Sequence, residues 1–263
     1  MLLAIDIGNT NTVFAAYNGG ALVKAWRCRT EATRSADEYA AFLNELFMLA
    51  KIIWDDFEGV IVSSVVPDAN FHIREFCQTY LKQPAIMVDH DMVGIEVDLD
   101  RPQDVGADRL VNAVAVYEHY KTPAIVIDFG TATTFDVIDK DGAYVGGVIA
   151  PGINLSVSAL HQGAAKLPSV SVKKTDKVLG KDTVGAIQSG IYWGYVSLIE
   201  GILNRLSDEM GEQPLVIATG GLASLFAEEI DMITEIDQDL TLKGLYFIYN
   251  KKKGSNVTDI SAA

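Results

Sequence analysis

The stretch Asp6-Ile7-Gly8-Asn9-Thr10 decides the fold, because its pattern returns at Asp128-Phe129-Gly130-Thr131. Each copy follows a short apolar run, at residues 2–5 and 124–127, that reads as a buried strand. Each copy also precedes a second β-type run and a glycine-containing hairpin signal. The chain therefore carries the same strand and turn twice, in a strand meander and not in a strand-helix-strand unit.

A constant offset relates the two copies, and a repeat of this kind fixes the domain plan. Placing Asp6 on Asp128 puts Gly8 on Gly130 and Thr12 on Thr134, 122 residues apart. The sequence therefore predicts an α/β protein of two duplicated lobes, residues 1–118 and 119–263, with mixed sheets and a cleft between them.

The remaining elements follow from apolar periodicity, capping signals and glycine or proline breaks. Ser35 and Glu38 form a capping box that opens the first helix. Further strands are predicted at 60–65, 85–88, 133–138, 144–149 and 215–218, and helices at 67–81, 106–120, 152–163, 183–208 and 240–249.

Composition narrows the class of protein. The 263 residues carry a formal net charge of −14, which argues against nucleic-acid and anionic-membrane partners. No apolar run approaches the roughly 20 residues of a membrane span, and the start of the chain reads as a strand and not as a signal peptide. The two cysteines and four histidines show no metal-ligand spacing, so we expect inert thiols and a cytoplasmic location. The Asn256-Val257-Thr258 sequon has no meaning in that compartment.

The first turn has the composition of a phosphate-binding turn. Asp6 ends a buried strand, where its charge needs compensation, and a magnesium-bound phosphate is a suitable partner. Gly8 permits close backbone approach, and donors follow at Asn9, Thr10, Asn11 and Thr12. An ordinary hairpin with an Asx turn is the alternative, but the second copy favours phosphate. A Walker A loop is absent, so this is not a P-loop enzyme.

The second turn provides a second clamp, with Thr131 and Thr133 as donors and Asp128 as a cation ligand. Phosphoryl transfer depends mainly on positioning and charge neutralisation, which two opposed turns can supply. Thr219-Gly220-Gly221 could seat a base and ribose or be a plain strand-to-helix turn, and the glycine-rich stretch 146–152 permits close approach of a ligand or of another chain.

Gly106-Ala107-Asp108-Arg109 opens a predicted helix, where the helix N-terminus stabilises a carboxylate. Asp108 could accept a hydroxyl proton, and Arg109 could hold a carboxylate in a bidentate fork. A charge pair with only a structural role is the simpler interpretation of these residues taken alone.

Six motifs, in order along nearly the whole chain, resemble the type III pantothenate kinase family: DIGNTNTVFA at 6–15, VGADR at 105–109, IDFGTATTFD at 127–136, GGVIAPG at 146–152, DTVGAIQSG at 182–190 and TGG at 219–221. The first motif alone would indicate only the wider superfamily of acetate and sugar kinases, heat-shock chaperones and actin. The resemblance implies two ribonuclease H-like, actin-like ATPase lobes.

It also implies transfer of the ATP γ-phosphate to the hydroxyl of pantothenate, the first step of coenzyme A biosynthesis, with Asp108 as proton acceptor. Pantothenate would be held by Gly106, Ala107, Asp108 and Arg109. ATP would be bound with magnesium at Asp6, and its implied contacts are Asp6, Ile7, Gly8, Asn9, Thr10, Asn11, Thr12, Val13 and Thr131.

Three further positions complete the implied site. Asp128 would hold a monovalent cation, potassium or ammonium. Thr183 would reach pantothenate from the partner subunit of a homodimer. Leu99 stands where the family often has a tyrosine, seven positions before Gly106; leucine can pack against the dimethyl part of pantothenate but cannot donate a hydrogen bond.

Two alternatives remain. Another kinase or phosphatase of the superfamily would act on acetate, a sugar or polyphosphate, but the motifs around Asp108 and Thr183 argue against it. A non-catalytic, nucleotide-dependent regulatory protein of the same superfamily would be expected to lose the base, and Asp108 is present.

Overall fold

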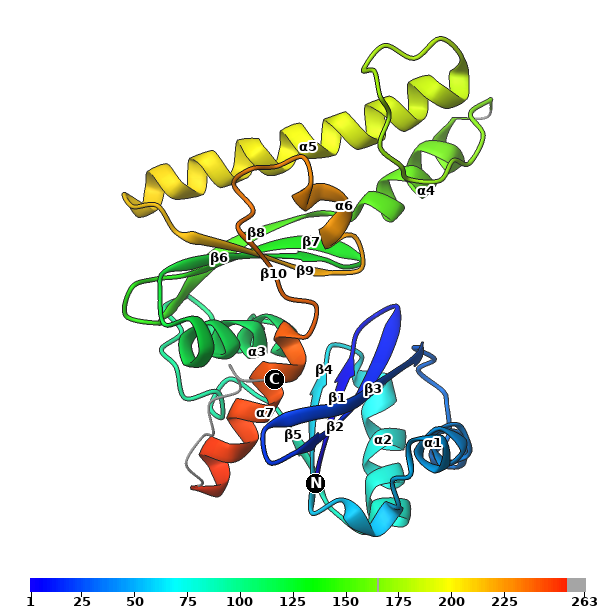
Figure 1. Ribbon diagram of the computed structural model, residues 1–263, viewed down its shortest axis with the longest axis vertical. Helices are drawn as coiled ribbons and strands as arrows, with labels where there is room; N and C mark the ends of the chain where they lie inside the picture. The colour runs from blue at the N-terminus through cyan, green and yellow to red at the C-terminus, as the bar shows by residue number, and fades with distance from the viewer. Residues whose placement is uncertain (165, 255–263) are drawn as a thin grey trace. The chain divides into compact units, whose positions relative to one another are not determined.

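The computed structural model describes residues 1–164 and 166–254, and the sequon at Asn256 lies outside them. The chain divides into two compact units. Unit 1 comprises Met1–Lys121 together with the described residues from Asp239 to Gly254, and unit 2 comprises Thr122–Gln238. Each unit is built on a five-stranded mixed sheet (Figure 1).

The sheet of unit 1 begins with an antiparallel meander, and two parallel strands extend it beyond β1. The strand order is β3-β2-β1-β4-β5. The strands are β1 (Leu2–Ile7), β2 (Asn11–Asn18), β3 (Ala21–Arg29), β4 (Gly59–Ser64) and β5 (Ala85–Met87).

The sheet of unit 2 repeats this plan, so the duplication predicted from the two turns is present in the fold. Its order is β10-β9-β6-β7-β8, with an antiparallel meander from β6 to β8 and parallel strands beyond β6. The strands are β6 (Ala124–Phe129), β7 (Ala132–Ile138), β8 (Tyr144–Pro151), β9 (Leu215–Gly220) and β10 (Glu235–Ile236).

The register of the two hairpins corrects one detail of the repeat. Ile7 pairs with Thr12, whereas Phe129 pairs with Thr133. The second turn is therefore one residue shorter than the first. Thr12 corresponds in the fold to Thr133, and not to Thr134 as the constant offset predicted.

The helices match the predicted segments. Turns of π-helix at Cys77–Leu81 and Val116–Tyr120 extend the second and third helices, and the Ser35–Glu38 capping box is formed. The helices are α1 (Ala36–Ala50), α2 (Asn70–Phe76), α3 (Ala107–Ala115), α4 (Ile153–Gly163), α5 (Thr183–Met210), α6 (Ala223–Ala227) and α7 (Leu240–Lys253), with 3-10 turns at Trp54–Asp56, Pro67–Ala69 and Pro102–Asp104.

The core of unit 1 forms because β1 and β4 are nearly continuous apolar runs that are buried on both faces of the sheet. On one face of the sheet, Phe14 packs edge-on against Tyr39 of α1, with ring centroids 5.9 Å apart. Tyr39 in turn contacts Phe76 of α2. Burial of these rings is the main stabilising contribution here, at about 25 cal/mol for each Å² of apolar surface.

The C-terminal helix α7 also belongs to unit 1, where it packs against α3, β1 and β4. Gly244 makes the helix contact close: a Cβ at this position would lie 2.1 Å from the carbonyl oxygen of Val111 in α3. Tyr246 stacks on Tyr17 of β2 at 5.1 Å. The helix at 240–249 was therefore predicted in its place in the sequence, but these contacts join it to the first compact unit and not to the second lobe.

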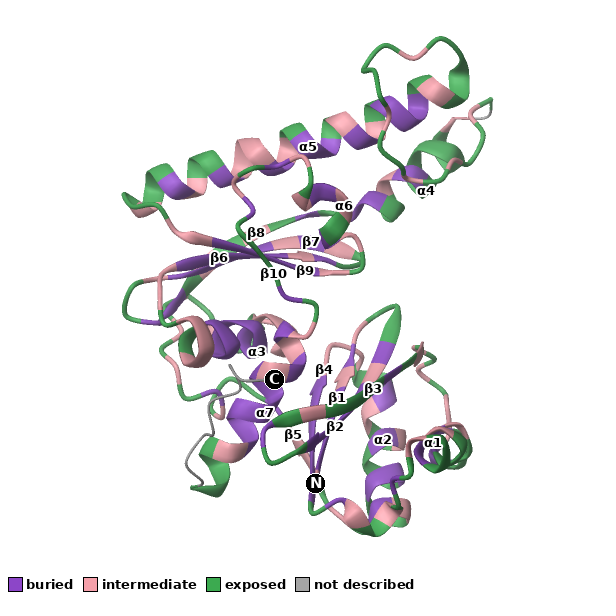
Figure 2. Cartoon of the chain, in the orientation of Figure 1, coloured by how far each residue is buried: buried purple, intermediate pink, exposed green. Residues whose placement is uncertain are grey.

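In unit 2, α5 and α6 pack on the apolar face of the sheet. Phe226 of α6 stacks on Phe129 of β6 at 5.3 Å and on Tyr192 of α5 at 5.6 Å. Figure 2 shows the buried strand β6 beneath α5, whose outer side is exposed. The two-residue strand β10 was not predicted, since so short a segment has no periodicity. Among the described residues, the structure holds no helix that is both long and apolar enough to cross a membrane.

Candidate active site

The turn after β1 is held rigid by a relay of hydroxyl groups. Thr30, just beyond β3, donates its hydroxyl hydrogen to the carbonyl oxygen of Gly8 at 2.7 Å. The buried Thr12 must therefore be the donor in its 2.9 Å bond with Thr30. The Gly8 N–H donates to the carbonyl of Asn11 at 3.0 Å, which closes the turn. These bonds leave Asn9, Thr10 and Asn11 exposed at its tip.

The turn after β6 uses the same device with different residues. The buried Thr133 bonds to the hydroxyl of Tyr195 at 2.5 Å, and Tyr195 donates onward to the carbonyl of Pro151 at 2.9 Å. Gly130 N–H donates to the carbonyl of Ala132 at 3.1 Å. Thr131 is exposed at the tip. In each unit, a buried threonine thus supports the turn that the sequence assigned to phosphate.

Neither Thr30 nor Tyr195 was predicted as part of the site. Thr30 lies 18 residues from Thr12. The hairpin between β2 and β3 places Cys28 opposite Thr12, so its register could have indicated Thr30. Tyr195 lies 62 residues from Thr133 on α5, and no sequence signal links the two.

The segment Gly106–Arg109 lies at the same end of sheet 1 as the Gly8 turn. Gly106 caps α3, and a Cβ on it would lie 2.6 Å from Asp108 Oδ1 and 3.6 Å from Val65 Cγ1. Val65 N–H donates to the carbonyl of Ile7 at 3.0 Å, immediately before Gly8. Unit 1 therefore brings together two predicted elements: the phosphate turn and the acidic residue of the α3 N-terminus.

The carboxyl group of Asp108 is half-buried in the first turn of α3. Burial raises the pKa of Asp108, and the backbone N–H and charge of Arg109 offset that rise only in part. The Arg109 N–H donates to Asp108 Oδ1 at 2.8 Å. The prediction that the helix N-terminus favours the ionised form identified a real but smaller effect. A raised pKa makes this carboxylate a stronger base than an exposed aspartate.

The carboxyl group of Asp128 lies where β6 meets the end of β9. Gly220 has φ of 88°, and a Cβ there would lie 2.7 Å from Asp128 Oδ1 and 2.8 Å from the carbonyl oxygen of Phe129. Thr134 pairs with Asp128 across the β6–β7 register. Glycine thus lets the end of β9 approach a carboxylate and a carbonyl oxygen closely, and these two oxygens are suitable donors for a hard cation. No group of three or more His, Cys, Asp or Glu side chains among the described residues could hold a metal ion.

Two further predicted site residues, Leu99 and Thr183, belong to segments other than the two turns. Leu99 is half-buried in the irregular stretch before the Pro102–Asp104 turn. Thr183 is exposed at the first turn of α5. Pro151 pairs with Ala132, so α4 starts near the Gly130 turn, and its 11 residues, about 16 Å, lead away toward the start of α5 (Figure 1). Unit 2 of one chain does not bring Thr183 to Asp128.

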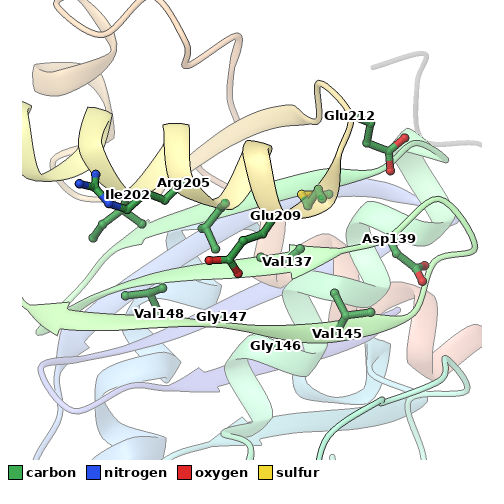
Figure 3. A pocket seen from close by; sticks show the side chains of 12 residues that line it. Val137, Asp139, Val145, Gly146, Gly147, Val148, Ile202, Arg205, Glu209 and Glu212 are labelled. Carbon is green, nitrogen blue, oxygen red and sulfur yellow. The ribbon is translucent and has the colours of Figure 1, made fainter.

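A pocket of about 500 Å³ lies between β7, β8 and the last turns of α5 (Figure 3). It is at the end of the unit 2 sheet opposite to the Gly130 turn. It includes Asp139, which follows β7, whereas the Gly130 turn precedes β7. The length of the strand, about 20 Å, therefore separates this pocket from the predicted phosphate turn.

The two cysteines fit the predicted inert role. Cys77 is fully buried, and burial raises its pKa to about 12. Burial also raises the pKa of Cys28, and Arg34 Nη1 donates to its sulfur at 2.6 Å. A thiolate is the reactive form, and these shifts disfavour it.

Two mixed five-stranded sheets, each with an Asp-Gly turn after its central strand, define the duplicated ribonuclease H-like fold of the actin-like class. The ROK hexokinase of Thermus thermophilus superposes with a TM-score of 0.51 at 12% identity, covering 97% of this chain and 99% of that chain. A Campylobacter jejuni protein assigned to the Baf family of transcriptional activators gives 0.60 at 20% identity, covering 96% and 99%. At these identities the likeness shows the fold alone.

The sequence itself identifies the family. The profile of the type III pantothenate kinases matches residues 2–205. The type III pantothenate kinase of Paramagnetospirillum magneticum is 52% identical over 253 residues, covering 95% of this chain and 97% of that protein. The chain belongs to the type III pantothenate kinase family.

Proposed function

We propose that the protein transfers the γ-phosphate of ATP to the hydroxyl of pantothenate, giving 4'-phosphopantothenate at the start of coenzyme A biosynthesis. One observation in a chain of this family carries the proposal. Unit 1 holds the Gly8 turn and the carboxyl group of Asp108 at the same end of one sheet, joined through Val65 and Ile7. A phosphate donor and a base for the acceptor hydroxyl are required side by side in such a reaction.

The nucleotide is assigned to the two rigid turns. The exposed residues Asn9, Thr10 and Asn11 offer donors to phosphate oxygens, and Thr131 offers another from the second turn. These local donors are needed because the chain carries a net charge of −14, which repels ATP on average. Asp6 is assigned to the magnesium that accompanies ATP, and that ion neutralises charge on the phosphates.

Asp108 is assigned as the general base. Its Oδ1 accepts the N–H of Arg109, so Oδ2 is the oxygen we assign to the pantothenate hydroxyl. As the hydroxyl oxygen bonds to the γ-phosphorus, its proton passes to Asp108 and the bond to the ADP oxygen breaks. The pKa raised by burial strengthens the base for this step.

The rest of pantothenate is assigned to residues around Asp108. The guanidinium of Arg109 suits the pantothenate carboxylate in a bidentate pair. Gly106 and Ala107, which precede Asp108 in the same segment, are assigned to the surface that contacts pantothenate. Leu99 offers an apolar contact to the dimethyl part. Thr183 is exposed and remote from the turn of its own unit, which supports its contribution from a second copy in a homodimer.

A monovalent cation, potassium or ammonium, is assigned to Asp128. The grouping of Asp128 Oδ1 and the Phe129 carbonyl oxygen around Gly220 supports this assignment. The cation would add positive charge near the second phosphate turn, and it would leave the proton step to Asp108.

The direct test supplies purified protein with ATP, magnesium, potassium and pantothenate, and follows phosphopantothenate by mass spectrometry. We expect product that depends on all of these components. Folded protein that forms no product would contradict the proposal, and acetate or hexose phosphorylation in its place would assign the chain to another activity of the superfamily.

A further inference from the structure

The connection between α4 and α5 contains a long segment, residues 166–182, with no helix or strand. Loops longer than about 12–15 residues are uncommon in compact domains and usually carry function. This one leads directly into Thr183, the first residue of α5. Its order therefore bears on where the Thr183 side chain is presented.

Three side chains on α5, here called the α5 clamp, bind this segment: Gln188, Ser189 and Trp193. Gln188 Nε2 donates to the carbonyl of Ser171 at 3.2 Å, and the Ser189 hydroxyl donates to the carbonyl of Val178. Trp193 Nε1 donates to the hydroxyl of Thr175 at 3.0 Å. The segment is thus bonded at three points along its length.

The positions of the clamp explain why polar residues occupy a buried stretch of helix. Ser189 and Trp193 are four residues apart, on one side of α5, and Gln188 lies beside them. Gln188 is 8% and Ser189 2% exposed. A buried polar group is costly without a partner, and here each partner is in the 166–182 segment. This side of α5 is built to hold the segment.

Two further contacts complete the attachment. A Cβ on Gly180 would lie 2.4 Å from the backbone nitrogen of Ala186, so the segment runs tightly against the first turn of α5. Lys174 forms an ion pair with Glu229 beyond α6. The approach to Thr183 is therefore fixed on one side by α5 and on the other by the residues after α6.

We propose that Gln188, Ser189 and Trp193 are positioning residues for pantothenate: they fix the 166–182 segment and, through it, the Thr183 side chain. This inference rests on the proposed contact between Thr183 and pantothenate. A loose segment would leave the start of α5 less ordered, and ordering it at each binding event would weaken affinity for the substrate that Thr183 contacts. Because the clamp already orders the segment in the folded protein, pantothenate binding does not have to order it. The KM for pantothenate should therefore depend on the clamp, while kcat should not.

The test compares Ser189→Ala with Trp193→Phe, which removes a second of the three donors but keeps an aromatic ring. Ser207→Ala is the matched control, since Ser207 is buried on the same helix and its hydroxyl has no hydrogen-bond partner among the described residues. The net contribution of one hydrogen bond corresponds to about a two- to tenfold change in an equilibrium constant such as a binding affinity. We expect KM for pantothenate to rise by that factor in both variants, with kcat and KM for ATP within twofold and the control unchanged.

Hydrogen–deuterium exchange supplies a readout that does not depend on catalysis. Peptides covering 171–182 should exchange faster in both clamp variants than in wild type and the control. Unchanged exchange would refute the clamp. Faster exchange with an unchanged KM for pantothenate would refute its positioning role. If the wild type did not phosphorylate pantothenate at all, the proposed function would fail, and the exchange rates alone would decide whether the clamp exists.

Discussion

Replacing Asp108 with Asn removes the proposed base with little change in shape. The side-chain oxygen of Asn can still accept the N–H of Arg109, as Asp108 Oδ1 does at 2.8 Å. The neighbouring Gly106 already leaves room for this oxygen, and the amide has nearly the same volume as the carboxyl group. The variant therefore tests proton acceptance and not the fold of the α3 N-terminus.

The expected loss is set by what a positioned base contributes. General base catalysis typically supplies about 10²–10⁴-fold in rate, and kcat should fall by about this factor. The affinity for ATP should stay within about threefold, because the nucleotide is assigned to turns that the substitution leaves intact. Asp104→Asn is the control: this carboxylate is exposed just before α3, beside Arg101, and kcat should hold within twofold.

The pKa of Asp108 gives two pH predictions of known sign. Because burial raises this pKa, the acidic limb of kcat/KM should lie above the pKa of an exposed aspartate, with activity lost as pH falls through it. Ionisation of Asp108 also costs folding free energy, since the raised pKa disfavours the charged form in the native state. Asp108→Asn should therefore be at least as stable as wild type at neutral pH, and this advantage should vanish below about pH 4.

The assay couples ADP release to NADH oxidation for kcat, with urea unfolding at several pH values for stability. The informative outcome is the combination of lost turnover and retained stability, which unfolding cannot produce. Turnover within a fewfold of wild type would show that Asp108 is not the base. A variant that lost both turnover and stability would show that the carboxylate has mainly a structural role.

Three further substitutions test other parts of the structure. Thr30→Val removes the hydroxyl relay behind the first turn and should raise KM for ATP by about two- to tenfold while KM for pantothenate holds, as initial rates would measure. Gly220→Ser would place a Cβ 2.7 Å from Asp128 Oδ1 and strain a φ of 88°, so the proposed cation ligand must shift and activation by potassium over sodium should disappear; persistent activation would contradict the site. Gly244→Ala places a Cβ 2.1 Å from a carbonyl oxygen of α3, and urea unfolding should show a loss of about 1–3 kcal/mol.

Local signals predicted most of the fold. Helix starts followed from side-chain caps such as Ser35 with Glu38, and strands from short buried runs ended by glycine. The repeat predicted two lobes of the same topology. The membership of α7 could not be predicted, because it depends on contacts with α3 and β1 more than a hundred residues away, and such contacts leave no local pattern.

The site was predictable to the same limit. The repeat indicated the two turns, whereas Asp108 was assigned through the family resemblance, because its residues taken alone favoured a structural charge pair. The supporting hydroxyl groups of Thr30 and Tyr195 were not found, because each acts across the fold and either residue would be ordinary where it stands. The pKa direction of Asp108 also required the structure, since burial outweighs the helix N-terminus there.

The two Asp-Gly turns share one sequence pattern, yet they differ in the residue that lies beside each turn on the neighbouring parallel strand. In unit 1, the position beside the turn on the parallel strand is Ser64, which pairs with Ile7. In unit 2, the same position is Gly220, which pairs with Phe129. Unit 1 therefore has a serine at the position where unit 2 has a glycine packed closely against Asp128 Oδ1 and the Phe129 carbonyl oxygen. Because the second turn groups a carboxylate and a carbonyl oxygen at this glycine, we assign the monovalent cation to Asp128 and the magnesium-bound phosphates to Asp6.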